Sequence, residues 1–356
     1  MSLPDPSAEI RITALQALRG ANFWSARPVT RMDLAVGAYD DISSADVAEV
    51  ATLLTRALPG LIEHRCSIGE RGGFLRRLKR GTYAPHIVEH VALELQTMAG
   101  FEVGYGKTRG GDAPGEYTLV FEHGHAGVGL RAAALALEIV QRAFAGTLDT
   151  VSPAVSELRS LMDTPDESPL HHHVLIGITG GGSRRETREE LVRLGFPDDA
   201  VIVDVSPAYI LQAGLPFSRA ELGIVLDTDV NDVPERYREP ERARRLMSVL
   251  ADGVWRGGIL VCPAREWEIQ DYARDVDCRV AVFALDADIS AADRKRAVAS
   301  AWVEDGHILL EGFDGSSNAG ALRADAPPCA QIAGALAAFA AQSLKPELLA
   351  ANVRSS

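Results

Sequence analysis

The sequence of 356 residues contains no uninterrupted apolar stretch as long as a membrane-spanning helix requires, which is about 18 residues. Its first six residues are acidic and carry prolines, and they lack the basic and apolar regions of a secretory signal. These absences argue against membrane insertion and secretion. We therefore expect a cytoplasmic protein with no membrane partner.

Cysteine is scarce, and the four thiols lie far apart with no Cys-x-x-Cys pair. Such spacing implies neither a disulfide framework nor a zinc site built from cysteines. We expect four buried or incidental thiols, namely Cys66, Cys262, Cys278 and Cys329.

Positive charge is in deficit, with 36 Lys and Arg residues against 49 Asp and Glu residues and a formal net charge of −13. Binding to nucleic acid generally requires a basic face, so no nucleic-acid partner is expected. An acidic surface instead tolerates a cationic, arginine-bearing partner. The hydrophobic fraction of 47% is typical of a soluble globular protein, and the length suits two domains.

Two clusters of turn-forming residues, at 147–153 and 163–169, flank a short helical stretch. We place a linker at 149–170, between a first domain at 1–148 and a second at 171–356. The first domain mixes strand-like and helical patterns, which predicts an α+β fold. Its expected strands are 10–14, 29–36 and 117–122, and its expected helices are 44–57, 73–80, 85–99 and 127–145.

After the linker, short β-rich runs alternate with helical segments, a pattern that predicts an α/β domain with a mostly parallel sheet. The expected strands are 174–178, 200–204, 222–227, 258–262 and 279–284, and the expected helices are 184–194, 240–253 and an alanine-rich one at 330–342.

The most informative helix begins near Thr82, a plausible N-cap, with Pro85 in the first turn. His86, His90 and Glu94 recur every four positions and so project from one stripe, with Glu89 beside them. An adjoining apolar stripe should face the core, formed by Ile87, Val91, Leu95 and Met98.

Two imidazoles one turn apart can ligate one zinc ion, and a neighbouring carboxylate can take a proton from zinc-bound water. The order His86, Glu89, His90 is the H-x-x-E-H arrangement of inverted zinc peptidases. In this interpretation His86 and His90 are metal ligands and Glu89 is the general base.

The third ligand stays open: it is Glu94, or a residue from elsewhere such as His64 or Glu63. The alternative for the whole set is a solvated helix face held by ordinary side-chain pairs. Two further histidine groups carry less weight. The one at 122–125 is more typical of a solvated turn, and the one at 171–173 of a polar approach to a strand.

Five blocks occur in order along the first domain: RGANFWS at 19–25, LPGLIEHRCS at 58–67, GGF at 72–74, HIVEHVALELQ at 86–96 and GKTR at 106–109. Together they resemble the amino-terminal domain of the cyanophycin synthetase family. Cyanophycin is a polyaspartate backbone with arginine attached to its side chains. In the family this domain contacts the polymer, and in some members it carries a metallopeptidase-like site that cuts the polymer into primers.

The resemblance implies His86, Glu89 and His90 as a hydrolytic centre with zinc as its cofactor. It also implies a set of residues that meet the substrate, since arginine suits bidentate contact with carboxylates. The alternative for the basic members of this set is solvated loop charge. The set consists of Arg71, Lys107, Arg109 and His64.

The second domain looks like the central, Mur-ligase-like part of the same enzymes in a decayed form. The family's phosphate loop ends in Gly-Lys-Thr, whereas this chain has GITGGGSRR at 177–185, so Arg184 and Arg185 replace the lysine and the hydroxyl. A metal-binding glutamate becomes Val230, and a nucleotide contact falls on 262–265. The ATP-grasp domain expected between the two domains is absent. We therefore expect neither ATP binding nor ligase activity, and a scaffold or oligomer interface instead.

These observations lead to one main hypothesis: a metal-dependent hydrolase of cyanophycin or a related aspartate/arginine isopeptide polymer, with an inactive ligase-like scaffold domain. The alternative is a non-catalytic protein that binds the polymer or associates with a synthetase. The expected partners are a cyanophycin-like polymer or peptide, and either a second copy of this chain or a full-length synthetase.

Overall fold

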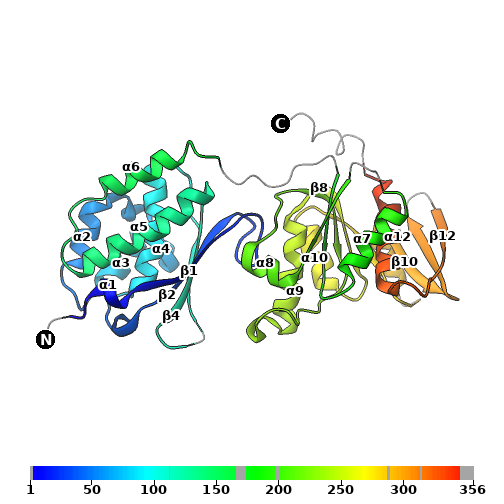
Figure 1. The fold of residues 1–356 in the computed structure, drawn as a ribbon, viewed down its shortest axis with the longest axis horizontal. Helices are drawn as coiled ribbons and strands as arrows, with labels where there is room; N and C mark the ends of the chain where they lie inside the picture. Colours follow the sequence, from blue (N-terminus) through cyan, green and yellow to red (C-terminus); the bar gives the residue numbers. More distant parts are fainter. Residues whose placement is uncertain are drawn as a thin grey trace. The chain divides into compact units, whose positions relative to one another are not determined.

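The computed structural model describes residues 3–111, 113–165, 174–196, 200–286, 289–312 and 315–344. The chain forms two compact units, one of Met1–Leu18 with Arg27–Ser168 and one of Arg19–Ala26 with Pro169–Ser356 (Figure 1). The segment Arg19–Ala26, expected inside the first domain, therefore folds with the second unit. Its backbone pairs there, because Arg19 N donates to Ala213 O at 3.2 Å and Leu215 N donates to Ala21 O at 2.9 Å.

The first unit contains a four-stranded antiparallel sheet in the order β1-β2-β4-β3. Helices α4 and α5 pack against this sheet (Figure 1). An antiparallel sheet with its helices packed alongside confirms the α+β prediction. The elements are α1 (Pro6–Glu9), β1 (Arg11–Leu18), β2 (Val29–Ala35), η1 (Gly37–Asp40), α2 (Val50–Ala57), η2 (Pro59–Glu63), η3 (Cys66–Ile68), α3 (Gly73–Arg80), α4 (Ala84–Ala99), β3 (Gly106–Gly110), β4 (Glu116–Glu122), α5 (Ala126–Phe144) and α6 (Ser152–Leu161).

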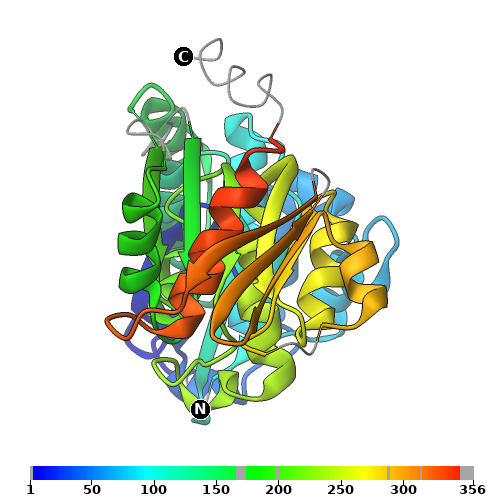
Figure 2. The ribbon, with the colours of Figure 1, turned by 90° about the vertical axis from the view of Figure 1, so that its right-hand side faces the viewer.

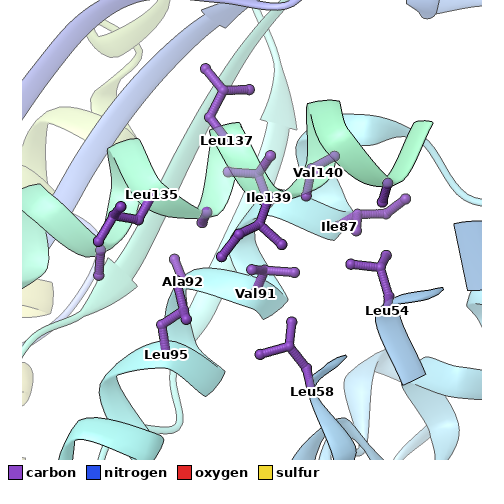
Figure 3. Close-up of a cluster of buried hydrophobic side chains, with 14 of the residues drawn as sticks. Leu54, Leu58, Ile87, Val91, Ala92, Leu95, Leu135, Leu137, Ile139 and Val140 are labelled. Carbon is purple, nitrogen blue, oxygen red and sulfur yellow. The ribbon is translucent and has the colours of Figure 1, made fainter. Parts of the chain in front are cut away.

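Helix α4 is held by an apolar core that it shares with α2 and α5 (Figure 3). Ile87, Val91 and Leu95 of α4 are fully buried, which confirms most of the predicted apolar stripe. Each such side chain contributes about 1.5–3 kcal/mol through burial. This core fixes the rotation of α4 and hence the direction of its other faces.

Two of the differences from the expected boundaries have a clear physical cause. Helix α2 begins at Val50 rather than near residue 44, because Ser44 Oγ donates to Leu78 O at 2.7 Å and holds the preceding segment in a turn. Helix α6 lies within the expected linker, yet its buried Ala154, Val155 and Leu158 belong to the core of the first unit. The first unit therefore extends beyond residue 148.

The second unit is built on an eight-stranded sheet in the order β12-β11-β10-β9-β8-β7-β5-β6. Pairing is parallel from β6 to β10 and antiparallel for β11 and β12, which confirms the mostly parallel α/β prediction. The elements are β5 (Val174–Thr179), α7 (Arg184–Arg193), β6 (Ala200–Val205), α8 (Pro207–Ala213), β7 (Ala220–Val225), η4 (Glu235–Tyr237), α9 (Pro240–Asp252), β8 (Val254–Pro263), α10 (Trp267–Asp275), β9 (Arg279–Phe283), α11 (Ala291–Arg296), β10 (Ala299–Glu304), β11 (His307–Gly312), β12 (Gly315–Ala321) and α12 (Pro328–Ala341).

Both faces of this sheet are covered (Figure 2). Leu175 of β5 packs in a core with α8, α9 and α10, whereas its neighbour Ile176 packs in a second core with α7 and α12. Successive strand residues point to opposite faces, so each strand of a sheet that is covered on both sides has a continuous run of apolar residues in its sequence. Across the described parts of both units, none of the helices is long and apolar enough to span a membrane.

Candidate metal centre

The candidate site lies on helix α4, whose ends are set by local sequence. Its N-cap is Tyr83 rather than the expected Thr82, and Pro85 occupies the first turn. Thr82 has another partner, since its Oγ1 lies 2.9 Å from His86 Nδ1. The helix ends at Ala99, and its C-cap is Gly100, whose φ of 118° suits glycine.

The polar stripe of α4 is not a solvated face. Glu89, His90 and Glu94 are only 5%, 6% and 4% exposed. All three line a cavity of about 860 Å³, together with His86 and residues from the segments before and after α4. A buried polar stripe on a cavity wall is unusual for a merely structural helix and suits a binding site.

The predicted ligands His86 and His90 gather with Cys66. In the described part of the chain, these three form the group whose donor atoms could hold a metal ion, with all three atoms within 4.8 Å of one another. Cys66 Sγ lies 3.3 Å from His86 Nε2. Cys66, expected to be an incidental thiol, therefore belongs to the site, and Glu94 is not in this group.

The backbone around Cys66 is shaped for this contact. Cys66 has a φ of 54°, a left-handed conformation that is costly for a residue other than glycine. Gly73 permits the close approach of α3 to the same loop, because a Cβ on Gly73 would lie 2.0 Å from Arg65 O. Strain of this kind is often stored at functional sites.

The chemistry of the three donors fits a zinc ion. Burial lowers the pKa of His86 to about 4 and, together with the charge of a protonated His86, that of His90 to about 2. Both imidazoles are therefore neutral at pH 7 and keep a lone pair for a metal. Thiolate and imidazole are the donors that zinc prefers. Phe74 stacks on the His90 ring at 3.9 Å between centroids and holds its plane.

Glu94 and His64 form a second layer of this site. His64 Nε2 lies 3.2 Å from Glu94 Oε2, and His64 Nδ1 lies 2.9 Å from His90 Nδ1. His64, predicted to meet substrate or metal, thus contacts a ligand candidate directly. Glu63, the other outside candidate, pairs with Arg71 instead.

Glu89, the predicted general base, lies next to the group on the same cavity wall. Burial raises the pKa of its carboxyl to about 7, although a hydrogen bond from Thr108 Oγ1 opposes this shift. Gly106 leaves the space that this carboxyl fills, since a Cβ there would lie 2.6 Å from Glu89 Oε1. A carboxyl with a pKa near 7 can both accept and return a proton.

The structure separates the predicted substrate-binding residues. Lys107 lines the cavity, whereas Arg71 and Arg109 do not; Arg71 is held in an exposed ion pair with Glu63, and Arg109 is exposed. A cation that the sequence did not single out, Arg77, also lines the cavity and donates to Ser67 Oγ at 2.9 Å. Arg77 lies on α3 outside the five sequence blocks, so no motif in the sequence pointed to it.

The other histidine groups have separate positions. His123 and His125 are each 8% exposed rather than solvated, and His125 accepts a hydrogen bond from Val128 N at the start of α5. His123 Nδ1 lies 3.0 Å from Thr30 Oγ1. Both have local structural partners. The run at 171–173 lies outside the described residues.

The backbone of the glycine-rich loop in the second unit donates a hydrogen bond to a carboxylate of the same unit. Gly181 N donates to Asp227 Oδ1 at 2.7 Å, and a Cβ on Gly181 would lie 2.5 Å from Asp229 Cβ. Arg184 donates to Gly180 O. Val230, expected at the place of a metal-binding glutamate, is 4% exposed and packs in the core.

Comparisons with known proteins find relatives for part of this chain. Residues 31–145 match the family model described as "Cyanophycin synthase-like N-terminal domain". The chain is 39% identical to the cyanophycin synthetase of Geminocystis herdmanii over 157 residues, which is 43% of this chain and 18% of that protein. It is 46% identical to the cyanophycin synthetase of Crocosphaera subtropica over 121 residues, which is 32% of this chain and 13% of that protein.

The expected resemblance to the cyanophycin synthetase family is thus confirmed for the amino-terminal domain. The chain spans less than a fifth of the length of these relatives. Among solved structures, it has weak similarity to a pseudomurein peptide ligase type C from Methanothermus fervidus, with a TM-score of 0.35, 11% identity and coverage of 62% of this chain and 55% of that one. A MurF ligase from Thermotoga maritima in complex with ADP is similarly distant. Its TM-score is 0.35 at 10% identity, and the match covers 53% of this chain and 48% of that one.

Proposed function

We propose that the first unit is a zinc-dependent hydrolase that cleaves amide bonds in cyanophycin or a related aspartate/arginine isopeptide polymer. The observation that carries this proposal is the group of Cys66, His86 and His90 on the wall of a cavity of about 860 Å³, with Glu89 beside it. Two imidazoles, one thiol and an adjacent carboxyl are the donor set and the base of a zinc hydrolase.

The residues of this chain would divide the work as follows. Cys66, His86 and His90 would hold zinc, which, when bound, acidifies a water molecule and polarises a carbonyl. Glu89 would accept a proton from the attacking water and return it to the leaving amine nitrogen. The acyl carbon gains the hydroxyl and the nitrogen gains the proton, so one amide bond is exchanged for a carboxyl group and an amine.

The substrate class comes from the similarity to cyanophycin synthetases together with the cavity walls. Lys107 and Arg77 line the cavity and can meet the free carboxylates of such a polymer, including those of its attached arginines. The cavity is large enough for several residues of a polymer. The second unit would serve as a scaffold, since its glycine-rich loop carries neither the lysine nor the hydroxyl that nucleotide binding requires.

Cleavage of purified cyanophycin tests this proposal. We expect the wild-type protein to release soluble aspartate/arginine chains and Glu89→Gln to be at least about 100-fold slower, as for the loss of a general base, with its zinc content retained. Glu70→Gln, an exposed residue paired with Arg76, is the matched control and should cleave at the wild-type rate. Full activity in Glu89→Gln would contradict the proposal, and polymer binding without cleavage by the wild type would favour the non-catalytic partner.

A further inference from the structure

A chain of hydrogen-bonding distances joins Glu94, His64 and the candidate ligand His90. Glu94 Oε2 is 3.2 Å from His64 Nε2, and His64 Nδ1 is 2.9 Å from His90 Nδ1. Glu94 and His90 are 4% and 6% exposed. Gly60 packs directly on the Glu94 carboxylate, since a Cβ there would lie 2.0 Å from its Oε1. Gly60 therefore leaves the space that the Glu94 carboxylate fills at the end of this chain.

We infer that Glu94 and His64 are positioning residues that fix His90 as the tautomer protonated at Nδ1, leaving the Nε2 lone pair for a metal ion. The order of donors follows from the carboxylate, which only accepts hydrogen bonds when ionised. In the inferred order His64 carries one proton, on Nε2. A neutral imidazole has a single N–H, so His64 Nδ1 accepts and His90 Nδ1 donates.

This arrangement gives both residues a role that differs from the predicted one. The sequence offers Glu94 and His64 as candidates for the third metal ligand and His64 also for substrate contact, whereas in this inference both orient a ligand. Outer partners of this kind fix the tautomer of a ligating histidine and typically change metal affinity by about 10–100-fold. His86 has a hydrogen-bonding partner of its own in Thr82, whose Oγ1 lies 2.9 Å from His86 Nδ1.

This inference adds two positioning residues to the proposed zinc site. Only its expected effect on zinc affinity rests on the proposed function. The tautomers themselves can be measured in the metal-free protein. Long-range ¹H–¹⁵N correlation spectra of ¹⁵N-histidine-labelled wild-type protein distinguish Nδ1–H, Nε2–H and doubly protonated rings. We expect Nδ1–H at His90 and Nε2–H at His64. Nε2–H at His90, or a doubly protonated His64, at pH 7 would overturn the inference.

Glu94→Gln is the variant that tests the origin of this order. An amide can present either its oxygen or its NH₂ group to His64, so the chain loses its fixed direction. We expect a mixture of His90 tautomers and a zinc Kd raised about tenfold or more in a chelator-competition titration. Glu70→Gln should leave both unchanged. Wild-type tautomers and affinity in Glu94→Gln would overturn the inference.

The two proposals fail in different ways. A protein that binds no zinc or cuts no polymer contradicts the proposed function, while the wild-type tautomers still decide the order of hydrogen-bond donors from His90 to Glu94. The wild-type measurement also needs no variant, so a poorly folded Glu94→Gln does not prevent a decision.

Discussion

Cys66 Sγ lies 3.3 Å from His86 Nε2, although 20 positions separate the two residues in the chain. The contact joins a loop residue with left-handed backbone to the first turn of α4. The contact places a thiol beside the two imidazoles, so that Cys66, His86 and His90 together form a set of three candidate zinc ligands.

Replacing Cys66 by serine should remove most of the bound zinc, because a hydroxyl is a much poorer zinc ligand than a thiolate. Zinc content of the purified variant, measured by elemental analysis, checks this expectation. Cys329→Ser, which changes a thiol of the second unit, is the matched control and should keep wild-type zinc. Unchanged zinc content in Cys66→Ser would rule Cys66 out as a ligand.

Gly106→Ala should reduce cleavage severely while zinc content is retained. The added Cβ would lie within 2.6–2.9 Å of three atoms of the Glu89 side chain, so the carboxyl must leave its position. Gly110→Ala is the control, since Gly110 lies on the same strand outside the cavity and a Cβ there meets no atom within 4 Å, and it should cleave at the wild-type rate. Equal rates for the two variants would show that the observed position of Glu89 is not required.

Lys107→Ala should raise the KM for soluble cyanophycin fragments about tenfold, the effect of losing one charge-assisted hydrogen bond. Arg109→Ala should leave KM unchanged, because Arg109 lies on the same strand but does not line the cavity. Steady-state kinetics of both variants check this contrast. A larger effect at Arg109 than at Lys107 would place the polymer elsewhere.

Glu190→Gln should destabilise the second unit at pH 7 by about 2 kcal/mol. Burial opposes ionisation of Glu190, but hydrogen bonds from Arg193 and Arg323 lower its pKa to about 2. A carboxyl with a lowered pKa stabilises the fold above its unfolded pKa of about 4.3, and this contribution is lost as the pH falls toward 2.

Denaturant unfolding of the wild type and the variant at several pH values measures this effect. Their difference should be full above about pH 5 and should shrink steadily toward pH 2. The control is Glu189→Gln, which removes an exposed carboxyl paired with Arg185 and should change stability by less than about 0.5 kcal/mol. A difference that stays constant with pH would contradict the assigned ion pairs.

The sequence was sufficient to predict helix α4 and the direction of its faces, because its apolar positions repeat with the helical period. Ile87, Val91 and Leu95 face the core as predicted. It also predicted that His86 and His90 share one stripe. These features depend on residues close together in the chain, where spacing alone fixes geometry.

Other features of the site and fold depend on contacts between residues far apart in the chain, which the spacing of residues in the sequence does not predict. Cys66 reaches His86 only through a turn with unusual backbone. Strand β12 was not predicted, because its sequence GSSNAGA has no apolar alternation and lies almost wholly exposed. Arg19–Ala26 folds with the second unit through backbone pairing, which carries no sequence pattern.

The most direct test of the central claim is cyanophycin cleavage by one preparation in three states: as purified with its zinc measured, after removal of metal by a chelator, and after zinc is restored. We expect near-stoichiometric zinc, soluble products, loss of cleavage with the chelator and recovery with zinc. A metal-free protein, or cleavage that continues unchanged after metal removal, would contradict the account.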